Sequence, residues 1–179
     1  MKYISLLRGV NVSGKNKIKM PELKFLYESL DLKNVETYIQ SGNVIFETKD
    51  KSISNIKSLI ENTIKNKFKF KVPVEIRTKL DLKNIIKNNP FGTIDLENEG
   101  TKVLVTFLAT KPNKDKITDL NKYVKLPEKL NIKGKEVYLY CPNGYGKSKL
   151  SNTFIEKKLE VAATTRNWKS VVKLYELST

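Results

Sequence analysis

The order of hydrophobic segments in residues 2–78 is the feature that most restricts the fold of this chain. Short apolar runs alternate with segments whose apolar residues recur at helical spacing, as Leu23, Leu26 and Leu30 do. The pattern predicts strands over 2–8, 34–39, 43–48 and Val72–Ile76, and helices over 21–30 and Ile53–Phe68. This β-α-β-β-α-β order is typical of a ferredoxin-like α+β subdomain, in which two helices cover one face of an antiparallel sheet.

The second half of the sequence repeats part of this order. We predict a linker with a short helix over 79–100, and a second, smaller α+β subdomain over 101–179 that packs on the first, 1–78, and ends in helices. Its expected elements are a strand over 102–108, a helix through Ile117, Leu120 and Val124, a hairpin of Leu130–Ile132 and Glu136–Tyr140, and a helix near 150–160. The last helix is expected to begin at Thr165 or Arg166, with Thr164 or Thr165 as its N-cap.

The composition excludes several kinds of chemistry. The chain has 179 residues, no His and one cysteine, Cys141. The lack of His excludes His-based acid–base catalysis and most zinc sites. A single cysteine excludes an internal disulfide. We therefore expect no metal and no cofactor, and no catalytic residues can be named. Arg8 interrupts the first apolar run, so no signal peptide or membrane span is expected, and we predict a cytoplasmic protein.

The net charge of +15 points to an anionic partner, either a nucleic acid or a phosphate-bearing small molecule. A lysine-rich composition is the alternative explanation, because only Arg8, Arg77 and Arg166 are arginines among the 34 basic residues. Dedicated nucleic-acid surfaces usually contain Arg, whose guanidinium group suits phosphate. Both interpretations therefore stand.

Two glycine-rich segments resemble phosphate-binding loops. Residues 9–16 nearly match the Walker A pattern, but Asn16 occupies the position of the magnesium-binding Ser or Thr. Residues 141–148 match less well, because Cys141 replaces the first glycine. An NTPase is therefore disfavoured. A backbone anion site with Lys15, Lys17 or Lys147 is still an option, and an ordinary tight turn with a solvated lysine is the more common case.

Polar residues follow the first strand and open the third. In a ferredoxin-like sheet these two strands are antiparallel neighbours, so Arg8 and Asn11 should lie at the same end of the sheet as Gln40, Ser41 and Asn43. The cluster could hold a ligand. Alternatively, the Ser and Asn side chains brace the turn through hydrogen bonds to its backbone.

The segment Thr164–Trp168 is the third candidate. A helix N-terminus with Thr caps and Arg166 in its first turn would attract an anion. In the alternative interpretation Thr caps the helix, Trp168 packs, and the Arg166 side chain extends to solvent. The two interpretations stand equal.

Three blocks carry a resemblance to a known family. Leu6–Val12, Thr37–Phe46 and Thr164–Val171 resemble the signature segments of a bacterial family catalogued as domain of unknown function 1697, and the likeness runs from Tyr3 to nearly the end of the chain. Ser13 stands where that family often has Gly. The resemblance implies two α+β subdomains with ferredoxin-like elements, and it implies no established activity.

The leading hypothesis is a monomeric, non-catalytic protein that binds an anionic ligand, a nucleic acid or a nucleotide-like molecule, and has no membrane partner. The alternative is a small enzyme whose phosphorylated or carboxylated substrate is held by Arg8 and Arg166. Aromatic residues that could stack on bases, or belong to the core, are Tyr3, Tyr38 and Phe46. The predicted ligand contacts are Arg8, Asn11, Lys15, Gln40, Ser41, Asn43, Arg166 and Asn167.

Overall fold

The computed structural model describes residues 1–50 and 52–179, which form two compact units. Unit 1 comprises Met1–Leu82 and Leu174–Thr179, and unit 2 comprises Lys83–Lys173. The described residues contain two four-stranded antiparallel sheets and six α-helices. The protein therefore belongs to the α+β class, as the sequence predicted.

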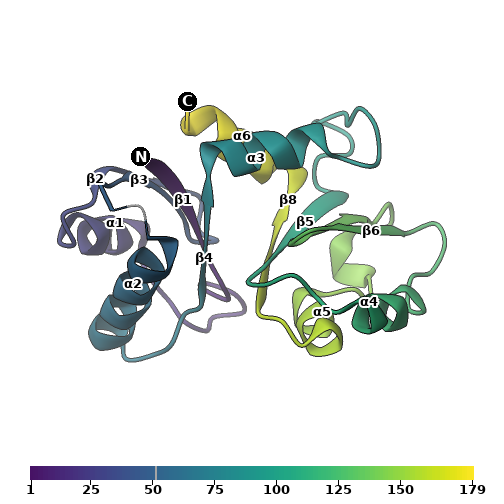
Figure 1. Cartoon of the computed structure of the whole chain (residues 1–179), viewed down its shortest axis with the longest axis horizontal. Coiled ribbons are helices and arrows are strands. Elements are labelled where there is room, and N and C mark those ends of the chain that lie inside the picture. Colours follow the sequence, from purple (N-terminus) through teal and green to yellow (C-terminus); the bar gives the residue numbers. More distant parts are fainter. Residues whose placement is uncertain (51) are drawn as a thin grey trace. The chain divides into compact units, whose positions relative to one another are not determined.

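Unit 1 contains one sheet and two covering helices. Its elements are β1 (Lys2–Leu7), α1 (Met20–Glu28), β2 (Lys33–Tyr38), β3 (Asn43–Glu47), α2 (Ile53–Phe68) and β4 (Val74–Thr78). The strand order is β2-β3-β1-β4, and every neighbouring pair is antiparallel. Figure 1 shows α1 and α2 next to each other on one face of this sheet. The end of β1 therefore lies beside the start of β3, because Leu6 pairs with Asn43.

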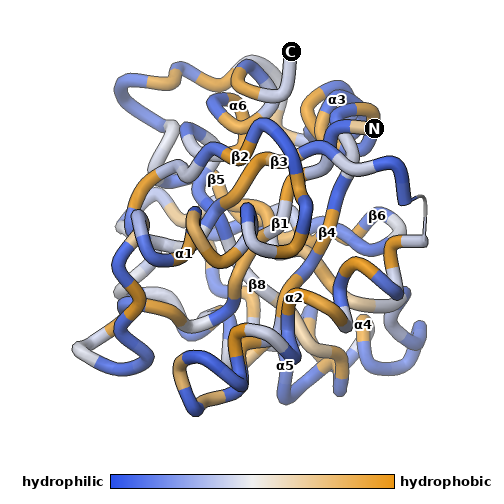
Figure 2. The backbone as a smooth tube through the Cα atoms, turned by 90° about the vertical axis from the view of Figure 1, so that its left-hand side faces the viewer, coloured by the Kyte–Doolittle hydropathy of each residue, from blue (hydrophilic) through white to orange (hydrophobic). Residues whose placement is uncertain are grey.

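The core of unit 1 lies between the sheet and these two helices. Alternate residues of β1 and β3, including Tyr3, Leu7 and Phe46, point into it, and β3 is hydrophobic along most of its length (Figure 2). From the helices, Leu26 and Ile60 are among the buried contributors. The period of two in the strands and the helical spacing in α1 and α2 thus place an apolar face of each element on this side of the sheet, and the core forms where these faces meet.

Unit 2 has a similar arrangement. Its elements are β5 (Val103–Leu108), α4 (Lys114–Asn121), β6 (Lys129–Lys133), β7 (Glu136–Tyr140), the short 3₁₀ helix η1 (Tyr145–Lys147), α5 (Asn152–Leu159) and β8 (Ala163–Asn167). The strand order is β6-β7-β5-β8. A core formed by residues such as Leu104, Leu139 and Ile155 lies between this sheet and helices α4 and α5. Helices α3 (Lys79–Lys87) and α6 (Trp168–Leu177) contribute residues to both units.

The predicted start of the last helix is wrong. Residues Ala163–Asn167 form β8, which pairs with β5, and the helix begins only at Trp168. The Thr165 hydroxyl lies 2.7 Å from the Thr106 hydroxyl of β5, so Thr165 forms a hydrogen bond across the sheet. The Asn167 side chain accepts the Ser170 N–H at 2.9 Å and caps α6. A β-branched Thr-Thr pair suits a strand as well as a cap, and pairing with β5 decides between them.

Candidate functional site

The candidate site of unit 1 forms where β1 ends. The Leu7 N–H donates to the Gly42 carbonyl at 2.8 Å, and the Arg8 N–H donates to the Pro73 carbonyl at 2.9 Å. The chain leaving β1 is therefore bound both to the β2–β3 turn and to the segment that enters β4. The loop that follows β1 therefore begins at this end of the sheet, and Arg8 is partly exposed.

Asn11 ties the loop after β1 to the β2–β3 turn. Its side-chain amide donates to the carbonyls of Ile18 and Gln40, both at 2.9 Å, and its side-chain oxygen accepts the Ile18 N–H at 2.9 Å. One side chain therefore satisfies three backbone groups that no strand or helix pairs. The predicted cluster is assembled here, but through the Gln40 backbone and not through its side chain.

Asn43 and Ser41 have internal partners in the turn. The buried Asn43 amide donates to the Tyr38 carbonyl and to the Ser41 hydroxyl, each at 2.9 Å. Turn bracing, the alternative that the sequence left open, thus accounts for these contacts. A ligand of Asn43 or Ser41 would have to displace these hydrogen bonds or bind beside them.

Residues 9–16 do not have the shape of a nucleotide-binding P-loop. Val12 and Lys15 form an isolated β-bridge, and the Asn11 N–H donates to the Asn16 carbonyl at 3.2 Å. Positive φ angles at Asn11, Ser13, Gly14 and Asn16 turn the backbone back on itself. The exposed Lys15 therefore lies on a small hairpin-like loop and not at the start of a helix.

A pocket of about 650 Å³ lies beside Asn11. It is lined by Asn11, Gly14, Lys17, Ile18, Lys19, Met20, Pro21, Glu22 and Gln40. Two predicted contacts, Asn11 and Gln40, belong to its wall, whereas Arg8, Lys15, Ser41 and Asn43 do not. The sequence missed Lys19 and the first turn of α1, because only the folded loop brings that helix start next to Gln40.

Arg166 and Asn167 belong to unit 2 and have structural contacts. The Arg166 guanidinium donates to the Thr164 hydroxyl at 2.8 Å and to the Thr165 carbonyl at 2.9 Å. Burial disfavours its charge and lowers its pKa to about 10, so it stays protonated at neutral pH. The expected arginine in the first turn of a helix is therefore a strand residue.

The second glycine-rich loop borders another pocket. Residues 141–148 contain η1, and Gly144 and Lys147 help to line a pocket of about 480 Å³ together with Lys125 and Lys149. Cys141 is buried, and burial raises the pKa of its thiol. Its position thus favours packing over nucleophilic chemistry.

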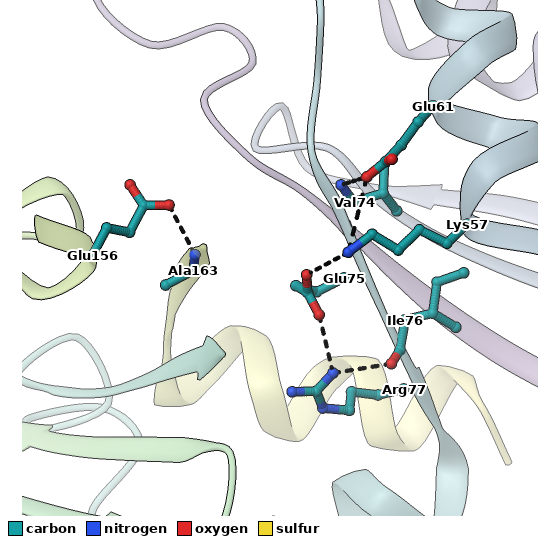
Figure 3. Close-up of polar contacts among 8 residues, drawn as sticks. All are labelled: Lys57, Glu61, Val74, Glu75, Ile76, Arg77, Glu156 and Ala163. Atoms are coloured by element: carbon teal, nitrogen blue, oxygen red, sulfur yellow. Dashed lines mark hydrogen bonds and ion pairs between the residues drawn. The ribbon is translucent and has the colours of Figure 1, made fainter. Parts of the chain in front are cut away.

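A charged cluster at strand β4 escaped the sequence prediction. The Glu75 carboxylate lies 2.9 Å from the Lys57 ammonium group and 3.5 Å from the Arg77 guanidinium (Figure 3). Arg77 also donates to the Ile76 carbonyl at 3.0 Å. The only signal in the sequence is a Glu and an Arg two residues apart in a strand, which places both on one face.

Three further observations concern metal ligands, membrane spans and aromatic rings. Within residues 1–50 and 52–179, no group of three or more Cys, Asp or Glu side chains is placed to hold a metal ion. None of the described helices combines the length and hydrophobicity needed to cross a membrane. Tyr3 and Phe46 pack on each other in the core, with ring centroids 5.8 Å apart, so neither is available to stack on a base.

Comparison with known proteins identifies the family. The sequence profile described as "Protein of unknown function (DUF1697)" matches residues 1–138. The chain belongs to the DUF1697 family. Among solved structures, this DUF1697 protein is similar to the conserved bacterial protein SP0830 from Streptococcus pneumoniae, with 23% identity and a TM-score of 0.77. That match covers 99% of this chain and 98% of the other, and it establishes a shared fold. No curated protein sequence matches the chain.

Replacing Asn11 by alanine should lower the free energy of unfolding by about 2 kcal/mol more than replacing Asn16, because the Asn11 side chain forms three hydrogen bonds, two within the loop and one to the β2–β3 turn. Asn16 forms one, to the Gly9 carbonyl at 3.1 Å. Both residues have positive φ, 55° and 48°, so the backbone cost of alanine is common to the two variants. Urea denaturation measures the difference, and equal values would show that the Asn11 contacts do not stabilise the loop.

Proposed function

We propose that this DUF1697 protein binds an anionic, nucleotide-like small molecule in the pocket beside Asn11. One observation carries the proposal: the loop after β1 and the β2–β3 turn meet at Asn11 and border a pocket of about 650 Å³ with Lys17 and Lys19 in its wall. A pocket of this size lies in the range that small-molecule ligands occupy. The two ammonium groups supply the charge that a phosphate requires.

The wall of the pocket suits a ligand with an apolar part as well as a phosphate. Ile18, Met20 and Pro21 contribute apolar surface, whereas Gln40 offers an amide. Because Met20, Pro21 and Glu22 line the pocket and open α1, the pocket also adjoins a helix start that, among the described residues, no side chain caps. A nucleotide or nucleoside phosphate combines the ring, the hydrogen-bonding edge and the charge that such a wall accommodates.

Other predictions accompany this proposal. The element order of unit 1 and its strand order β2-β3-β1-β4 support a ferredoxin-like subdomain. We likewise propose subdomains over 1–78 and 101–179 joined by 79–100. Cytoplasmic location and a monomeric state stay predictions.

Thermal-shift measurements test the pocket. Wild type should be stabilised by a nucleotide, a sugar phosphate or pyrophosphate. A ligand at 100 times its Kd adds about 2.7 kcal/mol, which raises Tm by roughly 5–10 °C in a chain of this size. The double variant Lys17→Ala/Lys19→Ala should lose most of that shift, because it removes both ammonium groups from the wall.

A charge-matched control separates the pocket from overall basicity. Lys114 and Lys157 are exposed residues of unit 2 that line neither described pocket. The variant Lys114→Ala/Lys157→Ala should keep the full ligand shift. Equal losses in both double variants, or no shift with any of these ligands, would contradict the proposed site.

A further inference from the structure

The end of helix α2 carries an unusual alternation of charge and aromatic rings. Residues 65–71 contain Lys at 65, 67, 69 and 71, with Phe68 and Phe70 between them and no acidic residue. All four lysines are exposed. Lys69 ends the helix with a left-handed φ of 65° and donates its N–H to the Lys65 carbonyl at 2.9 Å. The segment therefore has a defined conformation and is not a frayed helix end.

Helix α1 adds a third aromatic ring. Phe25 is 65% exposed, although phenylalanine side chains are usually buried. The Lys67 ammonium group lies 5.2 Å from the centroid of the Phe25 ring and 5.7 Å from that of Phe68. Phe68 and Phe70 are stacked, with centroids 6.1 Å apart and ring planes inclined by 29°. We call Phe25, Phe68 and Phe70 with Lys65, Lys67, Lys69 and Lys71 the Phe–Lys surface.

We propose that the Phe–Lys surface binds single-stranded nucleic acid. Proteins that bind single strands combine lysines along the phosphate backbone with aromatic rings on which bases stack. In the described part of the chain, none of the four lysines forms an ion pair with a carboxylate within 4 Å. Their charge is therefore available to phosphates, and the exposed Phe25 ring offers a face to a base.

The same geometry argues against a duplex or a membrane as the partner. A duplex hides the base faces that aromatic rings contact. Membrane surfaces are bound by several apolar side chains that project together. Here only Phe25 projects, whereas Phe68 and Phe70 are partly buried against the core of unit 1. One exposed ring beside Lys67, with three more exposed lysines in the same segment, fits a charged, stacking partner better than an acyl layer.

This inference goes beyond the proposed pocket. The Phe–Lys surface shares no residue with the pocket beside Asn11. Loss of nucleotide binding in Lys17→Ala/Lys19→Ala would not affect binding of single strands at the Phe–Lys surface. Failure of the oligonucleotide experiment would likewise not contradict the proposed pocket.

Fluorescence anisotropy with a labelled single-stranded oligonucleotide of about 12 nucleotides tests the inference. Between about 50 and 200 mM salt, the slope of log K against log salt should be about −3 for four phosphate contacts. Lys67→Ala/Lys71→Ala should reduce it to about −1.5. The control Lys114→Ala/Lys157→Ala should leave slope and affinity near those of wild type.

Phe25 distinguishes base stacking from simple hydrophobic contact. Phe25→Leu should weaken binding roughly fivefold or more, whereas Phe25→Trp should retain it, because only an aromatic ring stacks on a base. Position 25 is an exposed position of α1, so both variants should fold. Equal binding by Phe25→Leu, an equal loss in the control pair, or binding to phosphatidylserine vesicles without binding to the oligonucleotide would overturn the proposal.

Discussion

Gly42→Ala should destabilise unit 1 by about 4 kcal/mol, a large effect for a single methyl group. A Cβ at this position would lie 2.6 Å from Val10 Cγ2 and 2.8 Å from Leu7 Cβ. Overpacking of this kind costs about 1–3 kcal/mol. The φ of +75° adds about 1–2 kcal/mol for a residue with a side chain. The clash cannot relax easily, because the Leu7 N–H is bound to the Gly42 carbonyl.

Gly9→Ala is the matched control for this prediction. Gly9 has a similar φ of +67°, but among the described residues no neighbouring atom lies within 4 Å of the place that an added methyl group would occupy. Its replacement should cost about 1–2 kcal/mol, the backbone part alone. Urea denaturation of both variants isolates the steric part. Similar losses would show that the β1 end and the turn are not held as tightly as their contacts indicate.

Glu75→Gln should lower the free energy of unfolding by about 3 kcal/mol, because it removes a carboxylate that faces a buried guanidinium. The Arg77 side chain is 5% exposed and that of Glu75 is 9% exposed. Glutamine has the same shape but no charge, so the Arg77 guanidinium and the Lys57 ammonium group both lose this ionic partner (Figure 3). Truncating one member of a buried pair costs more than the pair contributes, since desolvation of the other charge is no longer offset.

An exposed pair provides the comparison. Glu97 lies 3.4 Å from the Lys169 ammonium group, and its side chain is 85% exposed. Glu97→Gln should change stability by less than about 0.5 kcal/mol. Thermal and urea denaturation, at low and at high salt, should both show a larger loss of stability for Glu75→Gln than for Glu97→Gln. A Glu75→Gln variant as stable as Glu97→Gln would mean that the β4 cluster is solvated in solution.

Local patterns in the sequence predicted most of the elements. Short apolar runs located β1 and β3, and helical spacing located α2, because both signals lie within a short window of the sequence. The antiparallel neighbourhood of β1 and β3 also followed from the element order. It correctly placed Asn11 near Gln40, although the structure joins them through a backbone carbonyl.

The failures come from residues whose local preferences are ambiguous. Thr164 and Thr165 suit an N-cap and a strand, and only the partner strand β5 settles the choice. Arg166 was expected at a helix start because the helix, which begins at Trp168, was placed two or three residues early. The pocket brings Lys19 next to Gln40, and Lys67 contacts Phe25. Each pair comes from two different segments, so no short window of the sequence contains both residues.

The sequence by itself determined the α+β class, the positions of most strands and helices, the absence of His chemistry, and membership of the DUF1697 family, which its signature blocks indicated. These follow from composition, periodicity and short motifs. Tertiary structure alone decided that Asn43 braces a turn, that Arg166 lies buried in a strand, and that Phe25 contacts Lys67 of α2. Such roles depend on which residues meet across the fold, and contacts between distant segments are set by packing of whole elements and not by local propensity.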